Sequence, residues 1–482
     1  MRALAPSRSR SIARNTVLQT LGHVVALGVA AGSAALLTRY LGVRAYGTFS
    51  LLTVVLVLPV TVLNGSLDTL AVRHLSAADG DPSFLHNVLA LKIALASCVA
   101  VLVAAIAAVA PLESALRAAL ALVSISIVAS GIQGTVLTVE QARMRFRLPV
   151  LVDVGGRALT LLVIAALVLA PRPAGSSTRV TLVVAAGAAA SLVWLVVTVV
   201  ARRGNVPLRL QRDAGVWRSL LRAGGPLALL SVLGLVNYRL DVVVLAALAG
   251  VRDVGIYAVA TRVVDTALPL AAFFVAAAFP VLSADVSLPL ADRQRRARRA
   301  AEFLLLASLP MAVGGCVFAP FLVRVVAGPA YADAVLPLRL LLASLPLSYL
   351  STFLVFMLVA ADKQRKVVPL MIASILVNLV LNVALVPRYG YNGSAVATLA
   401  SEICGAAALV AILRRALGVR ALGILLLKSP AAAAAMLATA VLAQPFGIAV
   451  AAIASCAVYG ACVLALRVVR PVDLKLLVQG AA

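Results

Sequence analysis

Charged and aromatic residues are scarce in this sequence, and the scarcity excludes a typical soluble protein. Of the 482 residues, 12% are charged and 5% aromatic, whereas 63% are hydrophobic. A typical soluble domain has about 25% charged and roughly 45–50% apolar residues. Even a large soluble domain leaves much of its surface in water, so it could not hide this much apolar surface. We therefore expect an integral membrane protein.

Cysteine and histidine are rare as well. The five cysteines lie inside apolar segments, no two with metal-ligand spacing, and none of the three histidines belongs to a zinc motif. We predict no metal site and no cofactor. The sequence also lacks a Gly-x-Ser-x-Gly elbow, a Walker loop and any large extramembrane domain, so we do not expect an enzyme.

Acidic residues are few, and the positions of the basic residues explain the net charge of +25. Basic residues cluster between apolar runs, with 28 of the 42 in alternate segments that include both termini and 7 in the others. This is the positive-inside pattern, so we place both termini in the cytoplasm. The clusters predict topology and contact with membrane lipids, and we expect no nucleic-acid partner.

Apolar runs long enough to cross a bilayer occur about fourteen times, given that a span takes about 20 residues. The predicted spans are 16–38, 45–71, 88–110, 116–139, 149–170, 180–201, 223–249, 254–280, 300–327, 335–360, 367–387, 392–413, 424–443 and 447–466. A Gly-Val-Arg-x-x-Gly turn at 42–47 recurs 208 residues later at 250–255. Such repetition indicates two six-helix bundles in parallel pseudo-repeat, as in some transporters.

The predicted fold is thus an all-α polytopic membrane protein in four parts. These are an N-terminal six-helix lobe (1–201), a cytoplasmic inter-lobe loop (202–222), a C-terminal six-helix lobe (223–414), and two additional helices with a cytoplasmic tail (415–482).

Charged residues inside the predicted spans are the candidates for function, because each costs about 2.5–3.5 kcal/mol at mid-membrane. Asp153 and Arg157 are four residues apart and Arg262 and Asp265 three apart, so each pair can neutralise itself on its own helix. Structural and functional roles stay open for both pairs. Asp68 lies near the inner interface, where a snorkelling role competes with a functional one.

Arg239 and Asp241 differ from these pairs, because residues two apart point to nearly opposite sides of a helix. Arg239, Arg262 and Glu402 are each predicted roughly 12–15 Å below the outer surface. Together with Asp241 and Asp265 they form either a polar layer that lines a cavity or a structural ion-pair network.

Asparagine also occurs inside a span, at Asn378 and Asn382, four residues apart. Hydrogen bonding between helices is the role we expect for this pair.

Three stretches give the chain a family resemblance over roughly residues 10–415. They are Thr38-Arg39-Tyr40-Leu41-Gly42 with Tyr46-Gly47, Tyr238-Arg239-Leu240-Asp241 with Gly255-Ile256-Tyr257, and Asn378 through Val386-Pro387-Arg388-Tyr389-Gly390 to Ser401-Glu402. They resemble the Wzx-like polysaccharide flippases of the multidrug/oligosaccharidyl-lipid/polysaccharide (MOP) exporter superfamily. Ser66 departs from the pattern where a glycine is expected, and fourteen spans exceed the twelve of the simplest members.

The resemblance implies two six-helix bundles that alternate between inward-open and outward-open states and flip a polyprenyl-diphosphate-linked oligosaccharide. On that basis Arg239, Arg262 and Arg157 would bind the anionic diphosphate. The carboxylates would be counter-ions or ion-coupling sites: Asp241, Asp265, Glu402, Asp68 and Asp153. A polysaccharide polymerase and glycosyltransferases would be pathway partners.

Alternatives to this function stay open. A multidrug antiporter and a lipid II flippase belong to the same superfamily, and the lipid II branch also has fourteen spans. A membrane scaffold fits poorly with paired halves and buried charges.

Overall fold

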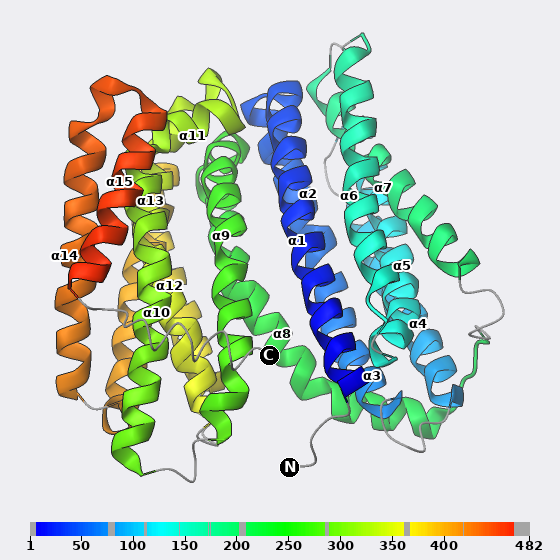
Figure 1. The fold of residues 1–482 in the computed structure, drawn as a ribbon. Coiled ribbons are helices and arrows are strands. Elements are labelled where there is room, and N and C mark those ends of the chain that lie inside the picture. The colour runs from blue at the N-terminus through cyan, green and yellow to red at the C-terminus, as the bar shows by residue number, and fades with distance from the viewer. Residues whose placement is uncertain are drawn as a thin grey trace. The chain divides into compact units, whose positions relative to one another are not determined.

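The computed structural model is helical along the part of the chain that it describes, and no strand occurs there (Figure 1). The described residues are 6–75, 82–109, 113–143, 145–171, 173, 175–201, 209–284, 289–360, 367–417 and 419–466. Eleven helices within them are long and apolar enough to cross a membrane, and Val25–Leu41 and Pro430–Leu442 are shorter apolar helices. One of the eleven, Val367–Ile412, covers two predicted spans. The polytopic all-α fold is therefore confirmed, with a helix at each predicted span.

The chain divides into two compact units, Met1–Arg239 and Leu240–Ala482. The helices that begin in the first unit are α1 (Pro6–Leu41), α2 (Val43–Leu63), α3 (Thr69–Leu75), α4 (Pro82–Val109), α5 (Ser114–Ala142), α6 (Arg147–Leu169), α7 (Ser176–Val200) and α8 (Ala214–Leu248), with a π-helical turn (Asn64–Asp68) between α2 and α3. Those of the second are α9 (Val251–Ala284), α10 (Leu290–Val317), α11 (Ala319–Val326), α12 (Val335–Ala360), α13 (Val367–Leu417), α14 (Val419–Leu442) and α15 (Ile448–Ala465).

The division falls inside α8, and the start of this helix is packed within the first unit. Leu220 of α8 lies in an apolar cluster with Leu67 and Val88. The backbone N–H of Asp213 donates to Asn87 Oδ1 at 2.8 Å, which fixes the segment before α8 to α4. The inter-lobe loop at 202–222 stays a prediction, and its residues 202–208 lie outside the described part, as does the predicted tail after 466.

In the first unit, α5 is the helix around which the others gather. It packs against α4, α7 and α2, and α1 packs against α6. Both faces of α5 therefore meet other helices, which explains why small or polar residues such as Ser124, Thr135 and Glu140 are buried along it.

In the second unit, α12 takes the same central position and packs against α9, α10 and α13. The last two helices, α14 and α15, pack against each other and α14 packs on α10. Tyr459 of α15 donates its hydroxyl to the Leu306 carbonyl at 3.0 Å, beside an apolar cluster around Met436. The two additional helices thus belong to the second unit's packed body.

The repeated glycine turn that the sequence predicts is present in both units. Gly42 (φ 75°) and Gly250 (φ 90°) have positive φ, and the next helix begins at the following residue in each case. The two turns are therefore locally equivalent, 208 residues apart.

Another glycine with positive φ, Gly390, interrupts helix α13. Gly390 has φ 52° and ψ −134°, so the helix kinks there, between the predicted spans 367–387 and 392–413. A Cβ on Gly390 would also collide with the carboxylate of Asp253. Glycine is required at this site both for its backbone conformation and for the close approach.

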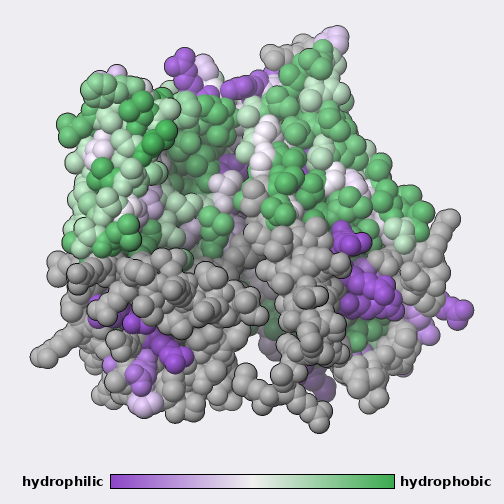
Figure 2. Space-filling view, viewed as in Figure 1, coloured by the Kyte–Doolittle hydropathy of each residue, from purple (hydrophilic) through white to green (hydrophobic). Residues whose placement is uncertain are grey.

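The described surface is largely apolar, as a lipid-facing surface should be. Figure 2 shows hydrophobic residues over much of the described area of this face. Large exposed side chains include Val101, Leu162, Val196, Val380 and Ile453, each more than half exposed.

Candidate functional site

Asp241 lies at the start of a buried polar network in the second unit. Its side chain is only 8% exposed, on α8, and it accepts hydrogen bonds from the Tyr257 hydroxyl of α9 and from the backbone N–H of Val242. Tyr257 is fully buried, and its hydroxyl is also 3.3 Å from Thr398 Oγ1 on α13. One carboxylate therefore links three helix segments through neutral hydroxyl groups.

The network continues along the two halves of α13. Ser394 donates to Asn382 Oδ1 at 2.8 Å, Asn382 donates to Asn378 Oδ1 at 3.0 Å, and Asn378 donates to Ser401 Oγ at 3.0 Å. These bonds join the segments before and after the kink at Gly390. The predicted role of the two asparagines, hydrogen bonding between helices, is confirmed.

Glu402 follows Ser401 directly and turns toward α12. It is half-buried, and Ser351 Oγ of α12 is 3.5 Å from its carboxylate. Asp241 and Glu402 are thus both in the polar interior of the second unit, each beside hydroxyl groups of a neighbouring helix.

Arg262 is a half-buried cation in the apolar span of α9. Among the described residues the structure shows no ion pair between Arg262 and Asp265, although they are three residues apart. Asp265 is half-buried as well. The self-neutralisation considered for this pair is not present in this conformation.

Arg239 lies near the end of the first unit with its guanidinium 4.6 Å from the ring centroid of Tyr238. The arginine is half-buried, and its neighbour Tyr238 is 39% exposed. A guanidinium that is stacked on an aromatic face can still present its N–H edge to a planar anion.

Arg157 and Asp153 form the ion pair that their spacing predicts. Arg157 Nε donates to Asp153 Oδ1 at 2.9 Å on α6, and both side chains are a little under half exposed. The pair lies on the surface of the first unit, and its two charges cancel locally.

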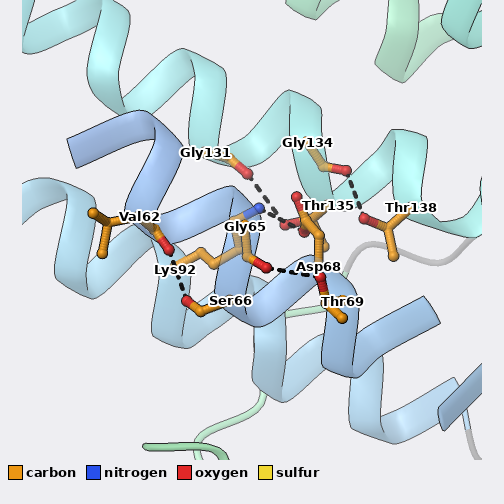
Figure 3. Close-up of polar contacts among 10 residues, drawn as sticks. All are labelled: Val62, Gly65, Ser66, Asp68, Thr69, Lys92, Gly131, Gly134, Thr135 and Thr138. Carbon is orange, nitrogen blue, oxygen red and sulfur yellow. Dashed lines mark hydrogen bonds and ion pairs between the residues drawn. The ribbon is translucent and has the colours of Figure 1, made fainter. Parts of the chain in front are cut away.

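Asp68 has a partner that the sequence pattern does not reveal. Lys92 Nζ of α4 donates to Asp68 Oδ1 at 2.7 Å, and the lysine side chain has no exposed surface (Figure 3). Asp68 itself is 15% exposed and ends the π-helical turn. The first unit therefore contains an almost completely buried ion pair.

The structure thus adds Lys92 and Tyr257 to the residues that the sequence predicts, and a physical reason explains why the sequence reveals neither. Lys92 is one charge in a long apolar run, and only the packing of α4 on the π-helical turn reveals its partner. Tyr257 has a mainly apolar side chain, so nothing in the sequence alone marks its hydroxyl as a partner of Asp241. Within the described residues no group of three or more His, Cys, Asp or Glu side chains could hold a metal ion.

The fold is shared with solved transporter structures. A structure of the lipid II flippase MurJ in an inward closed conformation matches with a TM-score of 0.75 at 14% identity, covering 94% of this chain and 98% of that one. A mutant of the Vibrio cholerae MATE transporter VcmN matches with a TM-score of 0.59 at 16% identity, covering 85% and 97%. At these identities the likeness establishes the fold.

A transporter of the MOP superfamily from Pyrococcus furiosus, described as having a binding pocket of reverse polarity, matches with a TM-score of 0.56 at 14% identity over 85% and 94% of the two chains. No curated protein sequence matches the chain. The family model described as polysaccharide biosynthesis protein matches residues 12–284, more than half of the sequence. The chain therefore belongs to the polysaccharide biosynthesis protein family, within a fold that it shares with MurJ and the MATE transporters of the MOP superfamily.

Proposed function

We propose that the protein is a flippase that moves a polyprenyl-diphosphate-linked oligosaccharide from the inner to the outer leaflet by alternating access. The observation that carries the proposal is the match to the polysaccharide biosynthesis family over residues 12–284. The buried charges of the two units supply the chemistry that such a substrate needs.

The diphosphate of the substrate is the group that a membrane-embedded arginine would bind. An arginine pairs with phosphate oxygens through two parallel N–H groups, and this attraction is stronger where water is excluded. Arg262 fits because it is half-buried in an apolar span and lacks an ion pair among the described residues. Arg239 is the second candidate, and Arg157 would first have to leave Asp153.

The Asp241 network is the proposed ion-coupling site. A buried carboxylate whose neighbours include neutral hydroxyl groups can change its charge by taking up a proton or a monovalent cation. Since Asp241 joins α8 to α9 and, through Tyr257, to α13, a change in its charge would alter the packing of three segments. Asp265, Glu402, Asp68 and Asp153 stay predicted counter-ions.

The membrane orientation is also part of the proposal. We propose that both termini lie in the cytoplasm of a bacterial inner membrane, and the basic clusters support this orientation. The substrate would then be received from glycosyltransferases inside and delivered to a polymerase outside.

The experiment compares outer-leaflet lipid-linked saccharide in cells that carry Arg262→Ala, Arg262→Lys or the wild-type protein. We expect Arg262→Ala to reduce flipping at least tenfold and Arg262→Lys to retain part of it, because lysine keeps the charge and loses the paired N–H geometry. Arg324→Ala, an exposed arginine of α11, is the control and should flip normally. Normal flipping by a stably expressed Arg262→Ala would remove this arginine from the mechanism.

Lipid II is the second candidate substrate. The match to the MurJ structure covers 94% of this chain and 98% of that one. Complementation of a strain lacking its lipid II flippase would favour this substrate. Multidrug antiport is the third possibility, and resistance to cationic drugs that depends on Asp241 would support it.

A further inference from the structure

The proposed function leaves Lys92 without a task, although its burial is extreme. The side chain is 0% exposed and its ammonium contacts the Asp68 carboxylate at 2.7 Å, eleven residues into the apolar helix α4. Taking two charges out of water costs several kcal/mol for each ion, and an ion pair of this kind is often no more stabilising than apolar side chains. A pair retained at such a cost calls for a reason beyond stability.

Asp68 lies in a local distortion of the helix. Asp68 is the last residue of the π-helical turn, in which the helix widens by one residue per turn. The hydroxyl groups of Ser66 and Thr69 donate back to carbonyls one turn earlier, at Val62 and Gly65. Figure 3 shows this turn facing Lys92 on one side and α5 on the other.

The opposite wall is the backbone of α5 at Gly134. A Cβ built there would lie 2.8 Å from Asn64 Oδ1 and 3.0 Å from Asp68 Oδ2, so a larger residue would displace these side chains. Asn64 Oδ1 is buried and has no hydrogen-bond donor within the described residues. Thr138 contributes a hydroxyl beside the same carboxylate.

A buried carboxylate beside a hydroxyl group offers oxygen ligands that suit a hard cation. We propose that Asp68 and Thr138, beside Gly134, form a monovalent-cation site whose cation is supplied by the chain itself. The Lys92 ammonium is that cation, and its covalent attachment to the chain keeps it beside Asp68. When a mutation removes the lysine side chain, the site binds a small primary alkylammonium ion instead. This proposal concerns the first unit alone and does not require the flippase function.

The test is chemical rescue of Lys92→Ala. This substitution removes the atoms from Cγ to Nζ, and n-propylammonium has the same three carbons and one nitrogen. Thermal unfolding of the purified full-length protein in detergent is measured with n-propylammonium chloride, with tetramethylammonium chloride and with choline chloride at equal ionic strength. We expect the unfolding temperature to fall by roughly 5–10 °C in Lys92→Ala and to recover by at least half with n-propylammonium only.

Two controls make the result specific. Lys92→Met fills the space with an apolar side chain, so it should be destabilised and should not respond to n-propylammonium. Asp68→Asn/Lys92→Ala lacks the carboxylate, so it should not respond either. A response of the double variant equal to that of Lys92→Ala, or no response of Lys92→Ala, overturns the proposal.

Purification with n-propylammonium present throughout recovers a Lys92→Ala protein that is stable only in its presence. If the Lys92→Ala protein cannot be purified even then, the unfolding temperature of the double variant Asp68→Asn/Lys92→Met is measured instead. An unfolding temperature close to that of the wild type supports a charge-balancing role for Lys92. A fall as large as that of Lys92→Met alone contradicts it.

Discussion

The two units hold a buried carboxylate in two different ways. In the first, Asp68 is met by the ammonium of Lys92 at 2.7 Å. In the second, Asp241 accepts hydrogen bonds from the Tyr257 hydroxyl and from a backbone N–H. The first arrangement fixes the charge of its carboxylate, because the partner is covalently tethered. In the second, the Tyr257 hydroxyl can hydrogen-bond to either charge state of the carboxylate. We therefore propose a constant charge for Asp68 and a variable one for Asp241.

Breaking the ion pair of the first unit should have the largest effect on stability. Lys92→Met leaves the Asp68 carboxylate buried without its cation, and we expect a loss of about 3–5 kcal/mol. Adding Asp68→Asn should recover most of this loss. Thermal and denaturant unfolding of the single and double variants provides the measurement, and a single variant as stable as the wild type would refute the importance of the pair.

Removing the Tyr257 hydroxyl tests the buried carboxylate of the second unit, and we expect a smaller loss of unfolding free energy. Tyr257→Phe deprives Asp241 of a donor while the ring still fills its place, so we expect a loss of about 1–3 kcal/mol. The flipping rate should fall by more than the loss of folded protein explains, because a change in the charge of Asp241 is the proposed coupling step. Unfolding and flipping are both measured on this variant to separate the two effects. A loss of flipping no larger than the loss of folded protein would argue for a structural role alone.

The sequence predicts the helices of this fold better than the partners of its charges. Spans follow from the length of apolar runs, and the turns at Gly42 and Gly250 follow from a repeated motif. Asp153 and Arg157 pair as predicted, since their partner choice is set by helical spacing alone.

Partners on different helices need the packing as well as the pattern. Asp68 and Lys92 are 24 residues apart and meet only because α4 packs beside the π-helical turn. Helical spacing alone also favours Arg239 over Arg262 as a ligand, because Arg262 can pair with Asp265. The structure shows no ion pair between Arg262 and Asp265 among the described residues, and on that ground we propose Arg262 as the first candidate.

The asparagine pair of α13 should contribute a smaller amount. Asn382→Ala removes its bonds to Asn378 and Ser394 and leaves the kink at Gly390 less well supported. Hydrogen bonds between membrane helices average about 0.6 kcal/mol and reach about 1.7 kcal/mol. Unfolding of this variant beside Tyr257→Phe would show how the network divides its stabilisation, and a loss exceeding that of Tyr257→Phe would contradict the expected order of the two effects.

The exposed pair on α6 should have the smallest effect on stability. Arg157→Ala removes an ion pair of the i, i+4 type, for which about 0.3–0.5 kcal/mol is expected. Unfolding of Arg157→Ala and Asp153→Asn gives the check. A loss of flipping at unchanged stability would identify Arg157 as a third ligand of the diphosphate, whereas a loss of several kcal/mol would show that the pair is more deeply placed than its exposure indicates.

Outer-leaflet lipid-linked saccharide, measured in cells that depend on this protein, tests the central claim most directly. Cells with Arg262→Ala should accumulate the substrate in the inner leaflet and expose at least tenfold less of it outside, while Arg324→Ala cells should match the wild type. Equal exposure in the Arg262→Ala and wild-type cells, at equal amounts of protein in the membrane, would contradict the assignment of Arg262 as the ligand of the diphosphate.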